Sequence, residues 1–151
     1  MKYQLRSASP SDLDLLMRIG HEGIRPYVES LFGWDLVEQE RRFREDFHPE
    51  QISVIQFEGE DVGYLKAEDK GDHIFLAGIY LLKRVRSVGL GSSIMTDLIL
   101  AARNSGKSIR LQVLRTNPAQ SLYQRLGFKI VGDSETHIFM ESSDAPCLGI
   151  P

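Results

Sequence analysis

The stretch Arg86-Ser87-Val88-Gly89-Leu90-Gly91-Ser92 follows an apolar run, His73 to Leu82, and precedes an amphipathic helical pattern expected over residues 92–104. Glycines let the chain turn sharply and let backbone N–H groups approach a ligand. A helix after such a turn starts with unpaired N–H groups and a partial positive charge. The stretch therefore favours binding of a pyrophosphate, with Lys83, Arg84 and Arg86 adding charge. The loop alone leaves open a tight strand-to-helix turn with surface arginines.

Two other phosphate motifs fail on closer reading. A dinucleotide fingerprint needs a third glycine, and Ile94 stands in its place. Residues 101–108 match a relaxed P-loop pattern that ends in Gly106-Lys107-Ser108. A P-loop follows a strand and precedes a helix, whereas here a helix precedes and a strand follows. We attribute that match to chance.

Length and composition predict one compact globular domain without nucleic acid as its main partner. The chain has 151 residues, and 18 Lys and Arg against 21 Asp and Glu give a net charge of −3. Its single cysteine, Cys147, excludes an internal disulfide and a zinc site, which favours a cytoplasmic location. No signal peptide is expected at the first residues, and the apolar run is too short to cross a membrane.

Hydrophobic periodicity predicts an α/β (α+β) chain with a mixed sheet. Asp35 is expected to cap a helix, and residues 27–32 are expected to form a short separate helix or turn. Residues 73–82 are expected to form a strand that is buried on both faces. The remaining polar end, residues 142–151, is expected to be a mobile or surface tail. The expected strands are 3–8, 52–57, 62–67, 73–82, 109–114, 128–131 and 136–140, and the expected helices are 11–22, 36–46, 92–104 and 118–126.

A second motif begins at Asn117, which can cap a helix with Pro118 in its first turn, and ends at Gly127-Phe128. Alone it is typical of an ordinary helix. Together with the Arg86–Gly91 loop, which fits Q/R-x-x-G-x-G/A, it resembles the GCN5-related N-acetyltransferase (GNAT) superfamily. The resemblance covers residues 3–141. It implies one GNAT-like domain over 1–141 with a tail at 142–151, and a mostly antiparallel twisted sheet flanked by helices.

The sequence departs from the family pattern at three positions. Lys83 stands where proline is common, and Ser87 stands where glycine is frequent. Gln112 stands where some protein N-terminal acetyltransferases of the family have a glutamate base. Because a glutamine cannot take a proton at neutral pH, this disfavours that subclass.

The resemblance implies acetyl-coenzyme A as cofactor and no metal. Its pyrophosphate would lie on the N–H groups from Ser87 to Gly91, and its pantetheine arm between two splayed strands that end near Leu81 and Leu114. A backbone N–H of the first strand would polarise the thioester carbonyl. Tyr123 would act as general acid toward the leaving thiolate. The implied cofactor-binding residues are Ile79, Tyr80, Leu81, Arg86, Ser87, Val88, Gly89, Leu90, Gly91, Ser92, Asn117, Ala119 and Tyr123.

The acceptor implied is a primary amine, on a small molecule or a peptide, which needs a base or a water relay. The candidate bases, each of which can also be read as an ordinary surface or structural group, are His21, Glu22, Glu68, Asp72, His73 and His137. Residues 21–43 would form the acceptor wall. Its charged and aromatic residues are His21, Glu22, Arg25, Tyr27, Glu29, Trp34 and Asp35. Tyr27, Phe32 and Trp34 are candidates for a pocket or for ordinary core.

We therefore predict acetyl transfer from acetyl-coenzyme A to an amine by direct attack within a ternary complex. Cys147 lies outside both motifs, so an acetyl-cysteine is not expected. The alternatives are a non-catalytic module of the same fold that binds or senses acyl-coenzyme A, and a structural domain without a cofactor. Exposed strand edges make a homodimer possible.

Overall fold

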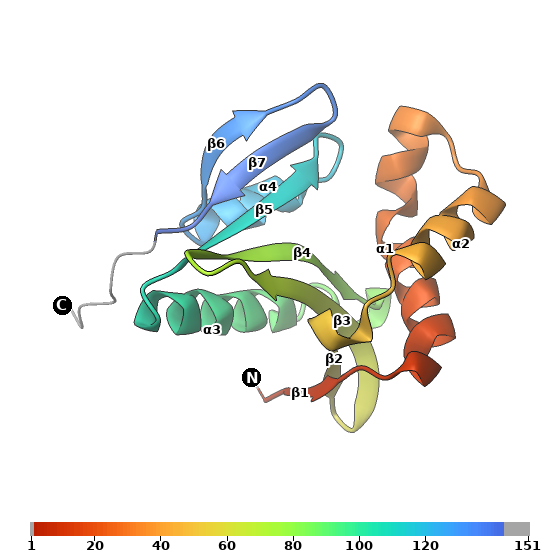
Figure 1. The fold of residues 1–151 in the computed structure, drawn as a ribbon, viewed down its shortest axis with the longest axis horizontal. Coiled ribbons are helices and arrows are strands. Elements are labelled where there is room, and N and C mark those ends of the chain that lie inside the picture. Colours follow the sequence, from red (N-terminus) through yellow and green to blue (C-terminus); the bar gives the residue numbers. More distant parts are fainter. Residues whose placement is uncertain (1, 144–151) are drawn as a thin grey trace. The chain divides into compact units, whose positions relative to one another are not determined.

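The computed structural model describes residues 2–143, which form two compact units. The first comprises residues 2–66 and 78–90, and the second comprises residues 67–77 and 91–143. The strands form a seven-stranded sheet in the order β1-β2-β3-β4-β5-β7-β6 (Figure 1). The ladders β1–β2, β2–β3, β5–β7 and β6–β7 are antiparallel, and β4–β5 is parallel. The predicted α/β class and mostly antiparallel sheet are confirmed.

In the first unit, β1 (Gln4–Ser7), β2 (Ile52–Phe57) and the first part of β3 (Glu60–Asp69) form antiparallel ladders. Helices α1 (Leu13–Phe32) and α2 (Leu36–Glu45) belong to this unit (Figure 1). A core cluster joins α1 to the sheet through Leu16, Ile19, Ile52, Val54 and Tyr64, all 5% exposed or less.

Polar contacts stabilise the N-terminal ends of these two helices. The Arg6 guanidinium on β1 pairs with Asp12, just before α1, and with Asp61 on β3, each at 2.9 Å. Asp35 caps α2, because its Oδ1 accepts a hydrogen bond from the Glu38 N–H at 3.2 Å. The predicted cap is confirmed.

The expected break between residues 22 and 27 is wrong, because α1 continues through Pro26 to Phe32. The glycines inside α1 allow close packing against the sheet and do not end the helix. A Cβ at Gly20 would collide with the Tyr64 hydroxyl, and one at Gly23 would come within 3.3 Å of Tyr80 Cδ1. Close packing of tyrosines from the sheet therefore outweighs the poor helix propensity of these residues. The helix ends at Gly33, whose φ of 75° suits a glycine.

In the second unit, β4 (His73–Leu81) begins and pairs in parallel with β5 (Ser108–Leu114) over His73–Leu76 and Ser108–Leu111. β7 (His137–Glu141) lies between β5 and β6 (Lys129–Asp133). Helix α3 (Leu90–Asn104) begins at the end of the first unit, and α4 (Ala119–Arg125) follows β5. Buried residues of the second unit include Ile94, Met95, Ile109, Leu111 and Met140.

Two expectations about burial need correction. Along β4 only Leu76 is buried and Ala77 is exposed, so this strand is not covered on both faces. An apolar run shows that a strand is hydrophobic, but not that both of its faces are packed. The predicted tail also begins inside the fold. Ser142 is 5% exposed, and its Oγ accepts from the Ile109 N–H at 2.8 Å. Cys147 and the rest of the tail, residues 144–151, lie outside the described residues.

Among residues 2–143, no helix is both long and apolar enough to span a bilayer.

Candidate functional site

The predicted phosphate loop is an exposed segment held at both ends by buried side chains. Val85 is 5% exposed and Leu90 is fully buried, whereas the four residues between them, 86–89, are exposed. Ser87 and Gly89 have φ values of 69° and 87°, in the left-handed region. Glycine adopts that region without strain, but serine does not do so readily. The Arg86–Gly89 backbone is thus strongly curved and open to solvent.

Helix α3 begins two residues earlier than expected, at Leu90 rather than Ser92. Leu90 and Gly91, predicted as loop residues, therefore belong to the first helical turn. The amides of a first turn have no partner within their own helix and carry its partial positive charge. The exposed loop leads directly into such a turn.

The positive side chains around the loop are already partly engaged. The Arg86 Nε donates to the Leu81 carbonyl oxygen at 2.8 Å, and its Nη2 lies 3.7 Å from Glu22 Oε1. Arg84 forms an ion pair with Glu60. Lys83 is exposed and has no carboxylate partner among residues 2–143. Of the three cations, Lys83 is the one most readily available to an incoming anion.

The second motif folds as the sequence predicts. The Asn117 Oδ1 accepts a hydrogen bond from the Ala119 N–H at 2.9 Å, so the Asn117 side chain satisfies the first amide of α4, with Pro118 at the N-cap position. Tyr123 is half-buried on α4, and its ring centroid lies 5.7 Å from that of Phe128. Aromatic packing against Phe128 thus holds the Tyr123 ring in place.

The candidate bases are distributed over different parts of the molecule. Glu68, Asp72 and His73 lie at the hairpin where β4 begins, and His73 Nδ1 is 2.7 Å from Asp72 Oδ1. The predicted cofactor residues Ile79–Leu81 lie at the opposite end of β4. His137 begins β7, and its Nδ1 lies 2.7 Å from the Thr136 hydroxyl. Each of these two histidines thus has a neighbouring residue as its hydrogen-bond partner. His21 and Glu22 instead line a cavity.

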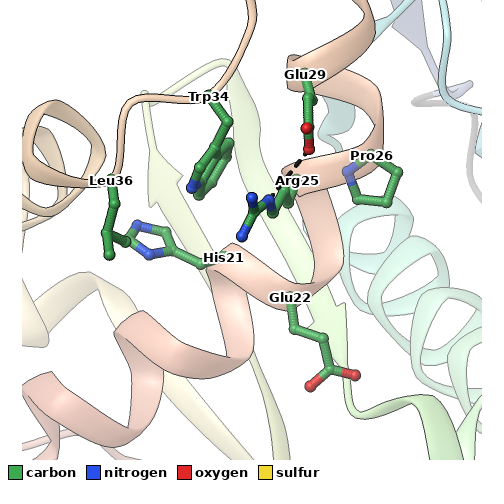
Figure 2. A pocket seen from close by; sticks show the side chains of 7 residues that line it. All are labelled: His21, Glu22, Arg25, Pro26, Glu29, Trp34 and Leu36. Carbon is green, nitrogen blue, oxygen red and sulfur yellow. Dashed lines mark hydrogen bonds and ion pairs between the residues drawn. The ribbon is translucent and has the colours of Figure 1, made fainter.

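That cavity, which we call the Trp34 pocket, has a volume of about 480 Å³ within the first unit (Figure 2). Its charged residues Glu22, Arg25 and Glu29 follow one another at helical spacing on α1, so they share a face of that helix. The remaining lining comes from α1, from the α1–α2 connection and from the first residue of α2. The pocket is lined by His21, Glu22, Arg25, Pro26, Glu29, Trp34 and Leu36.

Aromatic and ionic contacts fix the shape of the Trp34 pocket. The Trp34 ring meets the His21 ring edge-on, with centroids 5.3 Å apart, and the Arg25 guanidinium lies 5.4 Å from the Trp34 ring centroid. The Arg25 Nε also donates to Glu29 Oε2 at 3.1 Å. Burial lowers the pKa of His21 below its usual 6.5. A neutral His21 therefore adds no positive charge to the pocket near pH 7.

The sequence located this region but not its full composition. Of the predicted acceptor wall, His21, Glu22, Arg25, Glu29 and Trp34 do line the pocket. Tyr27, Phe32 and Asp35 do not, and Phe32 is 63% exposed. The sequence reasoning missed Pro26 and Leu36. The helical spacing of Pro26 with Glu22 and Glu29 was a usable signal, whereas Leu36 enters from beyond the α1–α2 turn and had none.

Comparison with known proteins identifies the class of the protein. Residues 48–130 match the family described as Acetyltransferase (GNAT) domain, and this range contains both the loop and the second motif. The chain therefore belongs to the GNAT acetyltransferase family. The predicted family and acetyltransferase activity are confirmed, and acetyl-coenzyme A is the donor that this family uses.

Individual relatives agree with this assignment. An N-alpha-acetyltransferase of Sulfolobus acidocaldarius is 26% identical over 166 residues, spanning all of this chain and 94% of the relative. The PaiA N-acetyltransferase of Thermoplasma acidophilum, solved with coenzyme A, superposes with a TM-score of 0.76 at 18% identity, covering 95% of this chain and 99% of that one. The ribosomal-protein-S18-alanine N-acetyltransferase of Escherichia coli gives 0.70 at 18% identity, covering 98% and 97%. These two structures show that the fold is shared.

Proposed function

We propose that this protein transfers an acetyl group from acetyl-coenzyme A to a primary amine by direct attack within a ternary complex. The observation that carries the proposal is the exposed Arg86–Gly89 loop, which has left-handed residues at Ser87 and Gly89 and runs into the first turn of α3. Curved backbone of this kind, followed by a helix start, suits a pyrophosphate.

The residues present fit the cofactor at this loop. Because residues 86–89 are exposed between buried Val85 and Leu90, their backbone can be contacted without disturbing the core. We assign the pyrophosphate to the amides of Ser87 to Gly91 and the first turn of α3 at Ser92. Lys83, which is exposed and lies three residues before Arg86, adds positive charge beside the pyrophosphate. When bound, acetyl-coenzyme A supplies the acetyl group as an activated thioester.

We assign the pantetheine arm to the backbone of Ile79, Tyr80 and Leu81 at the end of β4. On the β3 side, the Leu82 N–H donates to the Val62 carbonyl at 2.8 Å, and a Cβ at Gly63 would collide with the Tyr80 carbonyl oxygen. The side of β4 that faces β3 is therefore filled by backbone. The parallel ladder with β5 joins His73–Leu76 to Ser108–Leu111, before the Ile79–Leu81 segment is reached.

Two further roles complete the proposal. Tyr123 gives a proton to the thiolate that leaves, while Phe128 holds its ring. Asn117 and Ala119, at the start of α4, contact the arm. His21 and Glu22 are the candidate bases that line a cavity, so one of them, or a water molecule between them, would accept the proton of the attacking amine.

The acceptor binds, in this proposal, at the Trp34 pocket. The pocket is connected to the cofactor segment within the first unit, because Arg86 contacts both the Leu81 carbonyl and Glu22. Gly23 of α1, next to Glu22, also packs against Tyr80. We further propose a cytoplasmic location. We also propose that two copies of the chain form a homodimer through their exposed sheet edges.

A thiol-release assay over a broad amine panel tests the proposal. With purified full-length chain and acetyl-coenzyme A, we expect free thiol to appear with at least one amine and the amine to gain one acetyl group by mass spectrometry. Binding of acetyl-coenzyme A without thiol release for every amine would favour the acyl-coenzyme A sensing module instead. Absence of binding would leave only a structural domain.

A further inference from the structure

We infer that the Trp34 pocket selects a cationic primary amine with an apolar, preferably aromatic, body, oriented by Glu22. This inference rests on the proposed function, because it names the class of acceptor for the same site. The inference depends on two features of the pocket. The pocket has an apolar end and an acidic end, and its charged side chains differ in how they are already paired.

The apolar end is formed by Trp34 and Leu36, whereas Pro26 lies on the other side of Arg25 (Figure 2). Leu36 lines the pocket while remaining 53% exposed, and its neighbour Val37 is 79% exposed. Large apolar side chains exposed together commonly mark a binding surface. A cavity of about 480 Å³ with this lining has room for an aryl or branched alkyl group. An acceptor without an apolar body would leave this surface in contact with water.

The acidic end is formed by Glu22. Its only ion pair among residues 2–143 is with Arg86 at 3.7 Å, which is longer than a hydrogen bond. Glu29, in contrast, accepts a 3.1 Å hydrogen bond from Arg25. Glu22 is therefore the pocket carboxylate with capacity for a new donor. In Figure 2 its carboxylate lies at the edge of the group, directed away from Trp34.

The orientation follows from the position of Arg86. Arg86 contacts Glu22 and also donates to the Leu81 carbonyl, so the acidic end is the end nearest the proposed thioester segment. An ammonium group on Glu22 would therefore face the donor, while the apolar body would contact Trp34 and Leu36. This is the order in which an acceptor amine must be presented for transfer.

The charges favour a cation over an anion or a zwitterion. Glu22 and Glu29 are acidic, Arg25 is basic, and burial keeps His21 neutral near pH 7, so the lining carries one net negative charge. A carboxylate on the acceptor would be repelled by two glutamates and attracted only by a paired arginine.

The chemistry fits two sources, a free arylalkylamine and a peptide that begins with a large apolar residue. The chain has a single tryptophan, Trp34, so its fluorescence reports occupancy of the pocket without any turnover. We would titrate the full chain with 2-phenylethylamine, neutral 2-phenylethanol, anionic 3-phenylpropionate and small ethylamine. Tetrapeptides that begin with Phe, free or N-acetylated, form the second arm.

We expect saturable fluorescence changes, tightest for 2-phenylethylamine or the free peptide and about tenfold weaker for the neutral or acetylated partner, as loss of one charged hydrogen bond implies. E22Q should remove this difference between the cation and the alcohol. The matched control E50Q should preserve it, because Glu50 is an exposed carboxylate that does not line the pocket. Thermal unfolding would show that both variants remain folded.

The outcomes separate this inference from the proposed function. Equal or tighter binding of the anion, or no saturable change with any probe, would overturn the inference, while thiol release with other amines would still support the transferase. Selective binding of the apolar amine without thiol release would contradict its role as acceptor. Thiol release that follows the order of binding and loses its preference for apolar amines in W34A would support both.

Discussion

The Arg86–Gly89 loop and the Trp34 pocket belong to the same unit but are built in different ways. The loop presents backbone, shaped by two left-handed residues and by buried anchors on either side. The pocket presents side chains that are brought together by the packing of α1 and the α1–α2 connection. Backbone recognition suits a part common to all donors, whereas side-chain recognition suits the part that differs between acceptors.

The comparison implies that changes in the loop should affect the donor, and changes in the pocket should affect the acceptor. The largest effect is expected for G89V. A branched side chain at a φ of 87° is strained and would stand over the amides that we assign to the pyrophosphate. Affinity for acetyl-coenzyme A, measured calorimetrically, should fall about 100-fold or more, as strain and lost amide contacts combine.

The matched control for G89V is G59V. Gly59 has a φ of 80° and lies in the turn between β2 and β3, and a Cβ at this position would meet no other atom within 4 Å. The substitution therefore adds strain without filling a site, so this variant should lose stability but retain affinity for acetyl-coenzyme A. Equal loss of affinity in both variants would mean that strain, rather than the loop site, explains the result.

Tyr123→Phe separates chemistry from binding. Removal of the hydroxyl keeps the ring packed on Phe128 but removes the proposed proton donor. Turnover should fall about 100-fold while affinity for acetyl-coenzyme A stays nearly constant. Steady-state kinetics and calorimetry on the same preparation check this expectation. Unchanged turnover would exclude Tyr123 as the acid.

Trp34→Ala tests the pocket side of the comparison. Loss of the indole removes most of the apolar end, so KM for an apolar amine should rise about tenfold, with affinity for acetyl-coenzyme A unchanged. F32A is the control, because Phe32 is 63% exposed and does not line the pocket. If both variants raise KM equally, the acceptor binds on the general apolar surface and not in the pocket.

A smaller effect is expected on stability as a function of pH. Burial lowers the pKa of His21 below 6.5, so the unfolded chain takes up a proton at a higher pH than the folded chain does. The free energy of unfolding should therefore decrease as pH falls below 6.5, until His21 also becomes protonated in the folded state.

His21→Phe should remove that part of the pH dependence, since it keeps the ring contacts with Trp34 and Phe43. Urea unfolding at several pH values, compared between the wild type and the variant, measures the difference. An identical pH dependence in both proteins would show that groups other than His21 are responsible, and that the α1–α2 packing does not need a neutral His21.

The same contrast explains what could be predicted from the sequence. The loop and the Asn117 cap depend on residues close together in the chain, and both were located, although α3 starts at Leu90 rather than Ser92. The helix that was expected to stop at residue 22 continues to Phe32, and Gly20 and Gly23 let it pack closely against Tyr64 and Tyr80 of the sheet. Contacts between distant segments leave no local pattern to read.

The pocket shows the same limit. Residues 21–43 were identified as a wall through the family resemblance, and the spacing on α1 places Glu22, Arg25 and Glu29 on one face. Which aromatic side chain turns inward was not predictable, because Phe32 and Trp34 lie on either side of Gly33 and only the position of α2 distinguishes them.

Hydrogen exchange of individual amides, with and without saturating acetyl-coenzyme A, tests the central claim most directly. We expect exchange at Ser87 to Gly91 to slow when the donor is bound, while the amides of residues 33–35 at the Trp34 pocket change little. Unchanged exchange throughout the loop in the presence of bound acetyl-coenzyme A would contradict the assignment of the pyrophosphate to these backbone groups.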